Sequence, residues 1–153
     1  MWFFDIFKKQ KMLKFKEERK NEFSQNKEYV LNYLKTRNVK DDKYLQFIMD
    51  NDFAFLKDNK IVVFNKEYNQ NEEYMIENFL SCSNVAGRDI VQANKNLGLD
   101  DGDIVAVASV AGDDTICMNV KTNEICLYLI ETGDMQFVHV ADNFVEFCNM
   151  IKF

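Results

Sequence analysis

The stretch IVAVASVAGDDTICMNVKTNEICLYLI, residues 104–130, carries the clearest strand pattern of the chain. Its first part, 104–109, is continuously small and apolar, which is typical of a central strand that is covered on both faces. Residues 115–120 and 124–130 are two further apolar runs that are joined by a short polar loop, so they predict a hairpin. The turn 112–114 (GDD) joins the first run to this hairpin. The stretch therefore predicts an antiparallel meander.

Toward the C-terminus, one more strand and a closing helix are expected. Residues 135–140 (MQFVHV) predict the strand, after a turn around Gly133. Asn143 followed three residues later by Glu146 is the pattern of a capping box, which indicates where the helix begins. The apolar stripe of this helix consists of Phe144, Phe147, Cys148 and Ile151.

Toward the N-terminus, helical spacing alternates with one clear strand. Residues 60–65 (KIVVFN) predict a strand, whereas 72–81 (EEYMIENFLS) fit a helix or an extended turn. Helices are expected over 27–36, from Asp41 and Asp42 onward, and in part of 87–98. The chain 1–153 then reads as a single α+β domain with N-terminal helices, an antiparallel meander of about four to six strands and a closing C-terminal helix.

Residues 1–25 predict an amphipathic helical extension. Trp2, Phe3, Ile6 and Phe7 share one side of it, and residues 8–20 carry seven basic and two acidic side chains. Two interpretations are open: the aromatic end packs on the domain or a partner, or it makes a weak contact with an anionic membrane surface. The apolar run is too short to cross a bilayer, which takes roughly 20 residues, and it lacks the charge order of a signal peptide.

The composition indicates a globular chain with unusual turns. Hydrophobic residues make up 47% and aromatic residues 14%, which is too apolar for a disordered chain. There is no proline and there are only five glycines, so tight turns must be made largely by Asn and Asp.

Negative charge is concentrated in the second half. Residues 77–153 hold 12 acidic and 4 basic residues, which gives a net charge of −8. Residues 1–76 hold 13 acidic and 15 basic residues, which gives a net charge of +2. This balance argues against nucleic acid as the partner and favours a basic protein surface, although plain solubility explains it equally well. The candidate protein-binding residues are those of the acidic turns: Asp100, Asp101, Asp103, Asp113 and Asp114.

No set of residues with a catalytic pattern is recognisable. His139 is the single histidine, and its only potential thiol neighbours in the meander are Cys117 and Cys126. The cysteines form no C-x-x-C pair, so we expect reduced, buried thiols and a cytoplasmic location. The GDD and DDGD segments are expected to be turns, because the ligand spacing of a calcium loop is missing. We therefore expect no enzymatic activity, no cofactor and no bound metal.

Five ordered segments resemble the SUKH superfamily, which includes a fungal regulator of cell-wall synthesis and many bacterial proteins that neutralise toxins. The segments are 74–81 (YMIENFLS), 103–108 (DIVAVA), 112–119 (GDDTICMN), 124–128 (EICLY) and 141–147 (ADNFVEF). They cover residues 73–151, about half of the chain. Ala106 stands where the family has Pro, and Asn119 stands where it has Asp.

The resemblance implies an immunity protein that binds a cognate toxin domain, often a nuclease, and neutralises it without chemistry of its own. An acidic half facing a basic, nucleic-acid-cutting toxin agrees with this implication. The alternative is a regulatory or scaffold domain that binds an endogenous protein partner.

Overall fold

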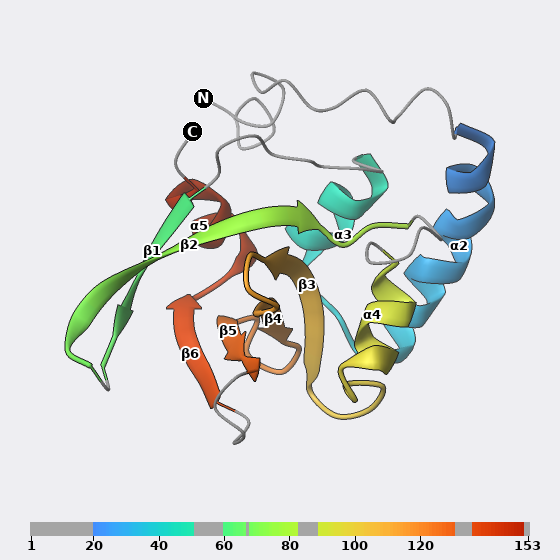
Figure 1. Ribbon diagram of the computed structural model, residues 1–153. Helices are drawn as coiled ribbons and strands as arrows, with labels where there is room; N and C mark the ends of the chain where they lie inside the picture. Colours follow the sequence, from blue (N-terminus) through green and yellow to red (C-terminus); the bar gives the residue numbers. More distant parts are fainter. Residues whose placement is uncertain (1–19, 51–59, 67, 83–88, 131–135, 152–153) are drawn as a thin grey trace.

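The computed structural model describes residues 20–50, 60–66, 68–82, 89–130 and 136–151 (Figure 1). In these ranges each strand pairs antiparallel with the next one along the chain, which gives a six-stranded meander in the order β1-β2-β3-β4-β5-β6. The strands are β1 (Lys60–Asn65), β2 (Gln70–Phe79), β3 (Ile104–Val110), β4 (Thr115–Asn119), β5 (Ile125–Leu129) and β6 (Gln136–Ala141). The helices are α2 (Lys20–Thr36), α3 (Asp42–Asp50), α4 (Ile90–Asn96) and α5 (Phe144–Met150). The predicted α+β class is confirmed.

The centre of the sheet matches the sequence expectation. β3 is buried on both faces from Val105 to Ala108. In β4 the residues from Thr115 to Met118 are buried as well. The closing helix α5 also begins as predicted, because the Asn143 side chain accepts a hydrogen bond from the Glu146 N–H at 2.9 Å. The Glu146 carboxylate reaches back one residue further than expected, to the N–H of Asp142.

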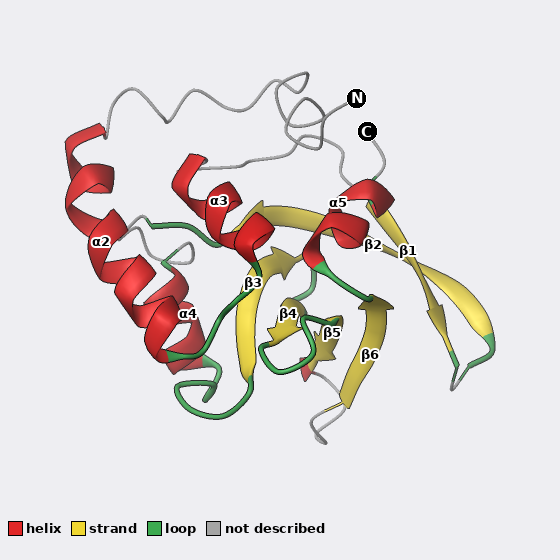
Figure 2. Cartoon of the chain, turned by 180° about the vertical axis from the view of Figure 1, so that it is seen from behind, coloured by secondary structure: helices red, strands yellow, loops and turns green. Residues whose placement is uncertain are grey.

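The helices pack their aromatic residues against one another and against β2. Rings from α3, β2 and α5 form one cluster, in which Phe47 lies 4.8 Å from Phe79 and 5.2 Å from Phe144 between ring centroids. Figure 2 shows α3 and α5 together on one side of the curved sheet, with α2 and α4 beside β3. Aromatic contacts of this kind add about 1 kcal/mol each beyond the burial of their area.

Asn and Asp replace glycine and proline in the turns, as the composition predicts. Four residues other than glycine have a positive φ in the described ranges, namely Asn38, Asn69, Asp113 and Asn123. Asn38 ends α2: its N–H bonds to the carbonyl of Lys35, and the next N–H bonds to that of Leu34.

The prediction for residues 72–81 is wrong, because β2 is a strand from Gln70 to Phe79. Its Glu-rich sequence contains good helix formers, but its backbone pairs with β1 along one half and with β3 along the other. Turn residues Lys66, Tyr68 and Asn69 precede this strand. The expected helix over residues 1–25 lies outside the described residues up to position 19, and α2 starts at Lys20 without a break at position 25.

β2 bends at an irregularity in its register. The pairing with β3 shifts between Ile76 and Asn78, which leaves Glu77 without a direct partner. An extra residue of this kind bends a strand and increases its twist. The hairpin of β1 and β2 is thereby turned out of the plane of the other strands, and β1 comes near β6, the far edge of the sheet (Figure 1).

A buried asparagine completes the pairing of β3 where β2 no longer runs beside it. The Asn94 side chain of α4 is fully buried, accepts a hydrogen bond from the Ala106 N–H at 2.9 Å, and donates to the Ile90 carbonyl at 2.8 Å. Without this side chain, the Ala106 N–H would lie in the core with no acceptor.

We expect Asn94→Ala to lower the free energy of unfolding by about 3 kcal/mol, because it removes a hydrogen bond and leaves a buried donor unsatisfied. Urea unfolding monitored by circular dichroism measures the effect. Lys95→Ala, at the exposed next position of α4, should change stability by less than about 0.5 kcal/mol. Equal effects of the two substitutions would contradict the bridging role of Asn94.

Candidate protein-binding site

The acidic turn, residues 100–103, lies between α4 and β3. Asp100 and Asp101 are exposed, and Asp103 is half-buried. The Asp103 carboxylate forms an ion pair with Lys121 at 3.0 Å, and its backbone carbonyl accepts a hydrogen bond from the Val120 N–H at 2.8 Å. The turn is therefore fixed on one side to the loop between β4 and β5.

A buried guanidinium fixes the other side of the acidic turn. Arg37, at the end of α2, is only 7% exposed. It donates to the carbonyl oxygens of Asp101, Gly102 and Ile104 at 3.3, 3.4 and 2.9 Å. It therefore neutralises the backbone dipoles of the turn and leaves the carboxylates of Asp100 and Asp101 facing solvent.

Tyr33 positions Arg37. The guanidinium donates to the Tyr33 hydroxyl at 2.8 Å and lies 5.7 Å from the centre of its ring. Burial raises the pKa of Tyr33, and the adjacent Arg37 charge opposes that shift. The phenol therefore stays protonated and keeps its acceptor lone pairs available to Arg37.

The second pair of predicted residues lies elsewhere. Asp113 and Asp114 follow β3, whereas the acidic turn precedes it, so the strand separates the two groups by roughly 20 Å at about 3.3 Å per residue. The Asp114 carboxylate accepts a hydrogen bond from the Ile130 N–H at 3.2 Å, and Asp113 has a φ of 68° in the turn. The structure thus brings Asp100, Asp101 and Asp103 together but does not bring Asp113 and Asp114 to them.

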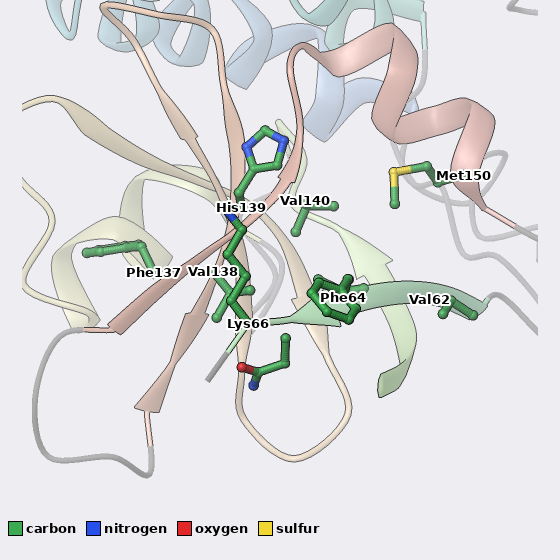
Figure 3. Close-up of a pocket in the computed structure, with 10 residues that line it drawn as sticks. Val62, Phe64, Lys66, Phe137, Val138, His139, Val140 and Met150 are labelled. Carbon is green, nitrogen blue, oxygen red and sulfur yellow. The ribbon is translucent and has the colours of Figure 1, made fainter. Parts of the chain in front are cut away.

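A groove of about 540 Å³ lies between the two outer strands of the sheet (Figure 3). Backbone and side chains of β1 form one wall, those of β6 form the other, and α5 contributes a side chain at one end. Its apolar lining consists of Val62, Val63, Phe64, Phe137, Val138, Val140 and Met150. The groove has the volume of a ligand site and is bounded by two strands.

His139 stands at the rim of this groove. Its ring is exposed and points away from Phe64 (Figure 3). Its Nδ1 lies 2.7 Å from a Glu124 carboxylate oxygen, and its Nε2 lies 3.5 Å from Asp142. The histidine therefore links two carboxylates at the surface.

The thiol that lies opposite His139 is not activated. Cys126 is the partner of His139 in the strand register, but its Sγ is directed to the carbonyl of Cys117 at 3.7 Å. Burial, followed by the charge of Glu124, raises the pKa of Cys126 to about 12. A thiol with a raised pKa is a poor nucleophile at neutral pH. All four cysteines are buried, as the sequence analysis expects.

The sequence analysis did not identify the groove, although one signal was present. Phe64 and Phe137 are 50% and 38% exposed at outward positions of edge strands, where polar residues are usual. Apolar side chains on both edges indicate a surface that contacts something apolar. That the two edges lie near each other is a property of the curved sheet, which no local pattern encodes.

Trp2, Phe3, Ile6 and Phe7 lie outside the described residues. Within those residues, no helix has the length and apolarity that crossing a membrane requires. No cluster of three or more His, Cys, Asp and Glu side chains in the same ranges is arranged to hold a metal ion. Comparisons with family models, curated proteins and solved structures find no match to the chain.

We expect Arg37→Met to release the acidic turn and to lower the free energy of unfolding by about 3 kcal/mol, since charged hydrogen bonds to several carbonyls are lost. Hydrogen exchange of residues 100–104 should become faster. Exchange in β4 and β5 should change only as much as the global loss of stability requires. Lys35→Met, an exposed position two residues earlier in the chain, serves as the control. Unchanged exchange in the turn would contradict this role of Arg37.

The buried thiols make stability fall at alkaline pH. The pKa values of Cys117, Cys126 and Cys148 are all raised by burial above the ordinary value of 9.0. Their contribution is therefore complete below that value and is lost as pH rises toward the folded-state pKa. Between pH 8.5 and 10 each thiol should reduce the free energy of unfolding by up to about 1.4 kcal/mol per pH unit. Urea unfolding of the wild type and of Cys126→Ala across this range tests it: an equal slope in both proteins would show that this thiol does not contribute.

Proposed function

We propose that the chain is a SUKH-type immunity protein, which binds a cognate bacterial toxin domain in the cytoplasm and neutralises it by occupying its surface. The toxin is a basic protein, and a nuclease fits best, because enzymes that bind nucleic acid present positive surfaces to phosphate. The immunity protein takes part through complementary shape and charge, without catalysis, a cofactor or a nucleic-acid partner of its own. The ordered resemblance of residues 73–151 supports this proposal.

The observation that carries the proposal is the acidic turn, whose backbone is held by Arg37 while Asp100 and Asp101 remain exposed. A binding loop that is ordered before the encounter loses little conformational entropy in the complex. Fixed carboxylates also steer a basic partner during diffusion and raise the association rate. The turn therefore suits rapid capture of a basic toxin.

Co-expression tests the proposal. The proposal predicts that a neighbouring upstream gene encodes the toxin domain, and the chain should restore growth of cells that produce this domain. Replacing Asp100 and Asp101 together by Asn should slow association about ten-fold at low ionic strength, with a smaller effect at high salt. The matched control replaces Glu28 and Glu77, two exposed acids on other elements, by Gln and removes the same charge.

Growth arrest despite abundant wild-type chain would contradict the proposal and would favour the regulatory or scaffold function. If the control slows association as strongly as the substitutions in the turn, net charge alone steers the partner, and the acidic turn has no special part.

A further inference from the structure

The two edges of the sheet face each other across the groove and run in opposite directions. Each of the six strands is antiparallel to its neighbour, so the first and the last are antiparallel as well. β1 and β6 lie near one another, and the groove extends along Val62–Lys66 on one side and Phe137–Val140 on the other. The sheet is therefore an incomplete barrel with one open seam.

The seam presents main-chain groups that favour a strand. In the described part of the chain, no strand pairs with β1 or β6 from the groove side. An exposed edge offers a row of N–H and C=O groups to any extended segment that approaches it. Protein domains use this chemistry to bind peptides, with main-chain hydrogen bonds for affinity and side-chain pockets for selectivity.

The dimensions fit a short segment. The walls are four to five residues long, Phe137–Val140 and Val62–Lys66. At about 3.3 Å per residue, they accommodate about four residues of an extended chain. Such a segment would be antiparallel to one edge and parallel to the other, and both pairings are regular β geometry.

The side chains around the seam define the chemistry of the occupant. The lining is apolar, with Phe64 and Phe137 both substantially exposed. Three carboxylates contact lining residues: Glu72 accepts a hydrogen bond from Asn65 at 3.3 Å, and Glu124 and Asp142 flank His139. Lys66 is the cation of the described lining. An occupant whose side chains alternate between apolar and basic therefore matches this surface.

We propose that the seam between β1 and β6 binds an extended segment of the partner, about four residues long with alternating apolar and basic side chains, by strand addition. The identity of that partner as a toxin rests on the function proposed above, whereas the binding mode does not. The apolar side chains fill the groove, the basic ones on the opposite face of the segment meet Glu124 and Asp142, and the main chain bonds to one or both edges.

The test uses synthetic probes with the full chain. The probe is the peptide acetyl-(Lys-Val)₄-amide, titrated into ¹⁵N-labelled protein and followed by NMR. We expect chemical-shift changes at the amides of Val62–Phe64 and Phe137–Val140. Two matched peptides serve as controls: acetyl-(Glu-Val)₄-amide, and the Lys-Val peptide with N-methyl groups at alternate residues. Each should bind at least about ten-fold more weakly, since the first loses charge complementarity and the second loses main-chain donors.

A variant confines the effect to the seam. Phe64→Arg with Val62→Arg should weaken binding of the Lys-Val peptide at least about ten-fold by repulsion. Tyr29→Arg with Tyr68→Arg adds the same charge at two exposed aromatic positions and should leave binding near that of the wild type. Both variants are compared at temperatures equally far below the midpoints of their thermal unfolding. Well-dispersed amide signals in the NMR spectra show that each variant is folded.

Each outcome decides the inference. Equal binding of the N-methylated peptide excludes strand addition, equal binding of the Glu-Val peptide excludes a basic occupant, and shifts confined to other elements exclude the seam. A dimer in light scattering that the seam variant abolishes would make a second copy the occupant. Toxin neutralisation is scored separately: if the seam variant still neutralises while the acidic-turn variant does not, the toxin does not use the seam and the proposed function stands. Peptide binding at the seam without neutralisation by the wild type supports the seam but ends the toxin assignment.

Discussion

β2 pairs with two different strands along its length, and the way it does so determines the shape of the molecule. Its first half pairs with β1 and its second half with β3, with a register irregularity at Glu77 between the two. The bend at this point turns the first hairpin toward β6, the other edge of the sheet. With a straight β2, the outer strands would lie at opposite ends of an open sheet, and there would be no seam between them.

The two candidate binding features are built by different means. The acidic turn is a loop held by side chains: Arg37 bonds to its carbonyls, and Lys121 pairs with Asp103. The seam is made by the backbone edges of two strands, so its geometry depends on the whole sheet. A partner that uses both features would first be attracted by the charge of the turn, which raises the association rate. Main-chain pairing at the seam would then hold the partner in place, which lowers the dissociation rate.

Local patterns predicted the elements whose environment is uniform. The apolar residues of β3 and β4 and the stripe of α5 are mostly buried, so periodicity identified these elements. The prediction for residues 72–81 failed because this Glu-rich sequence forms a strand only by pairing with its neighbouring strands. The acidic turn was visible as sequence, but its tie to Arg37 joins residues 64 to 67 positions apart. The seam joins still more distant segments, so the apolar residues of its edges did not reveal that these edges lie near each other.

The meander order has one more consequence. Every ladder joins strands that follow one another in the chain, and only the connection between β2 and β3, which contains α4, is long. The other ladders form from local contacts at little loop-closure cost. Only the seam relates the first strand to the last. A segment bound there would close the sheet and join its first strand to its last. Because the segment would bind only the folded state, its binding would stabilise the entire domain against unfolding and not only the few residues that it contacts.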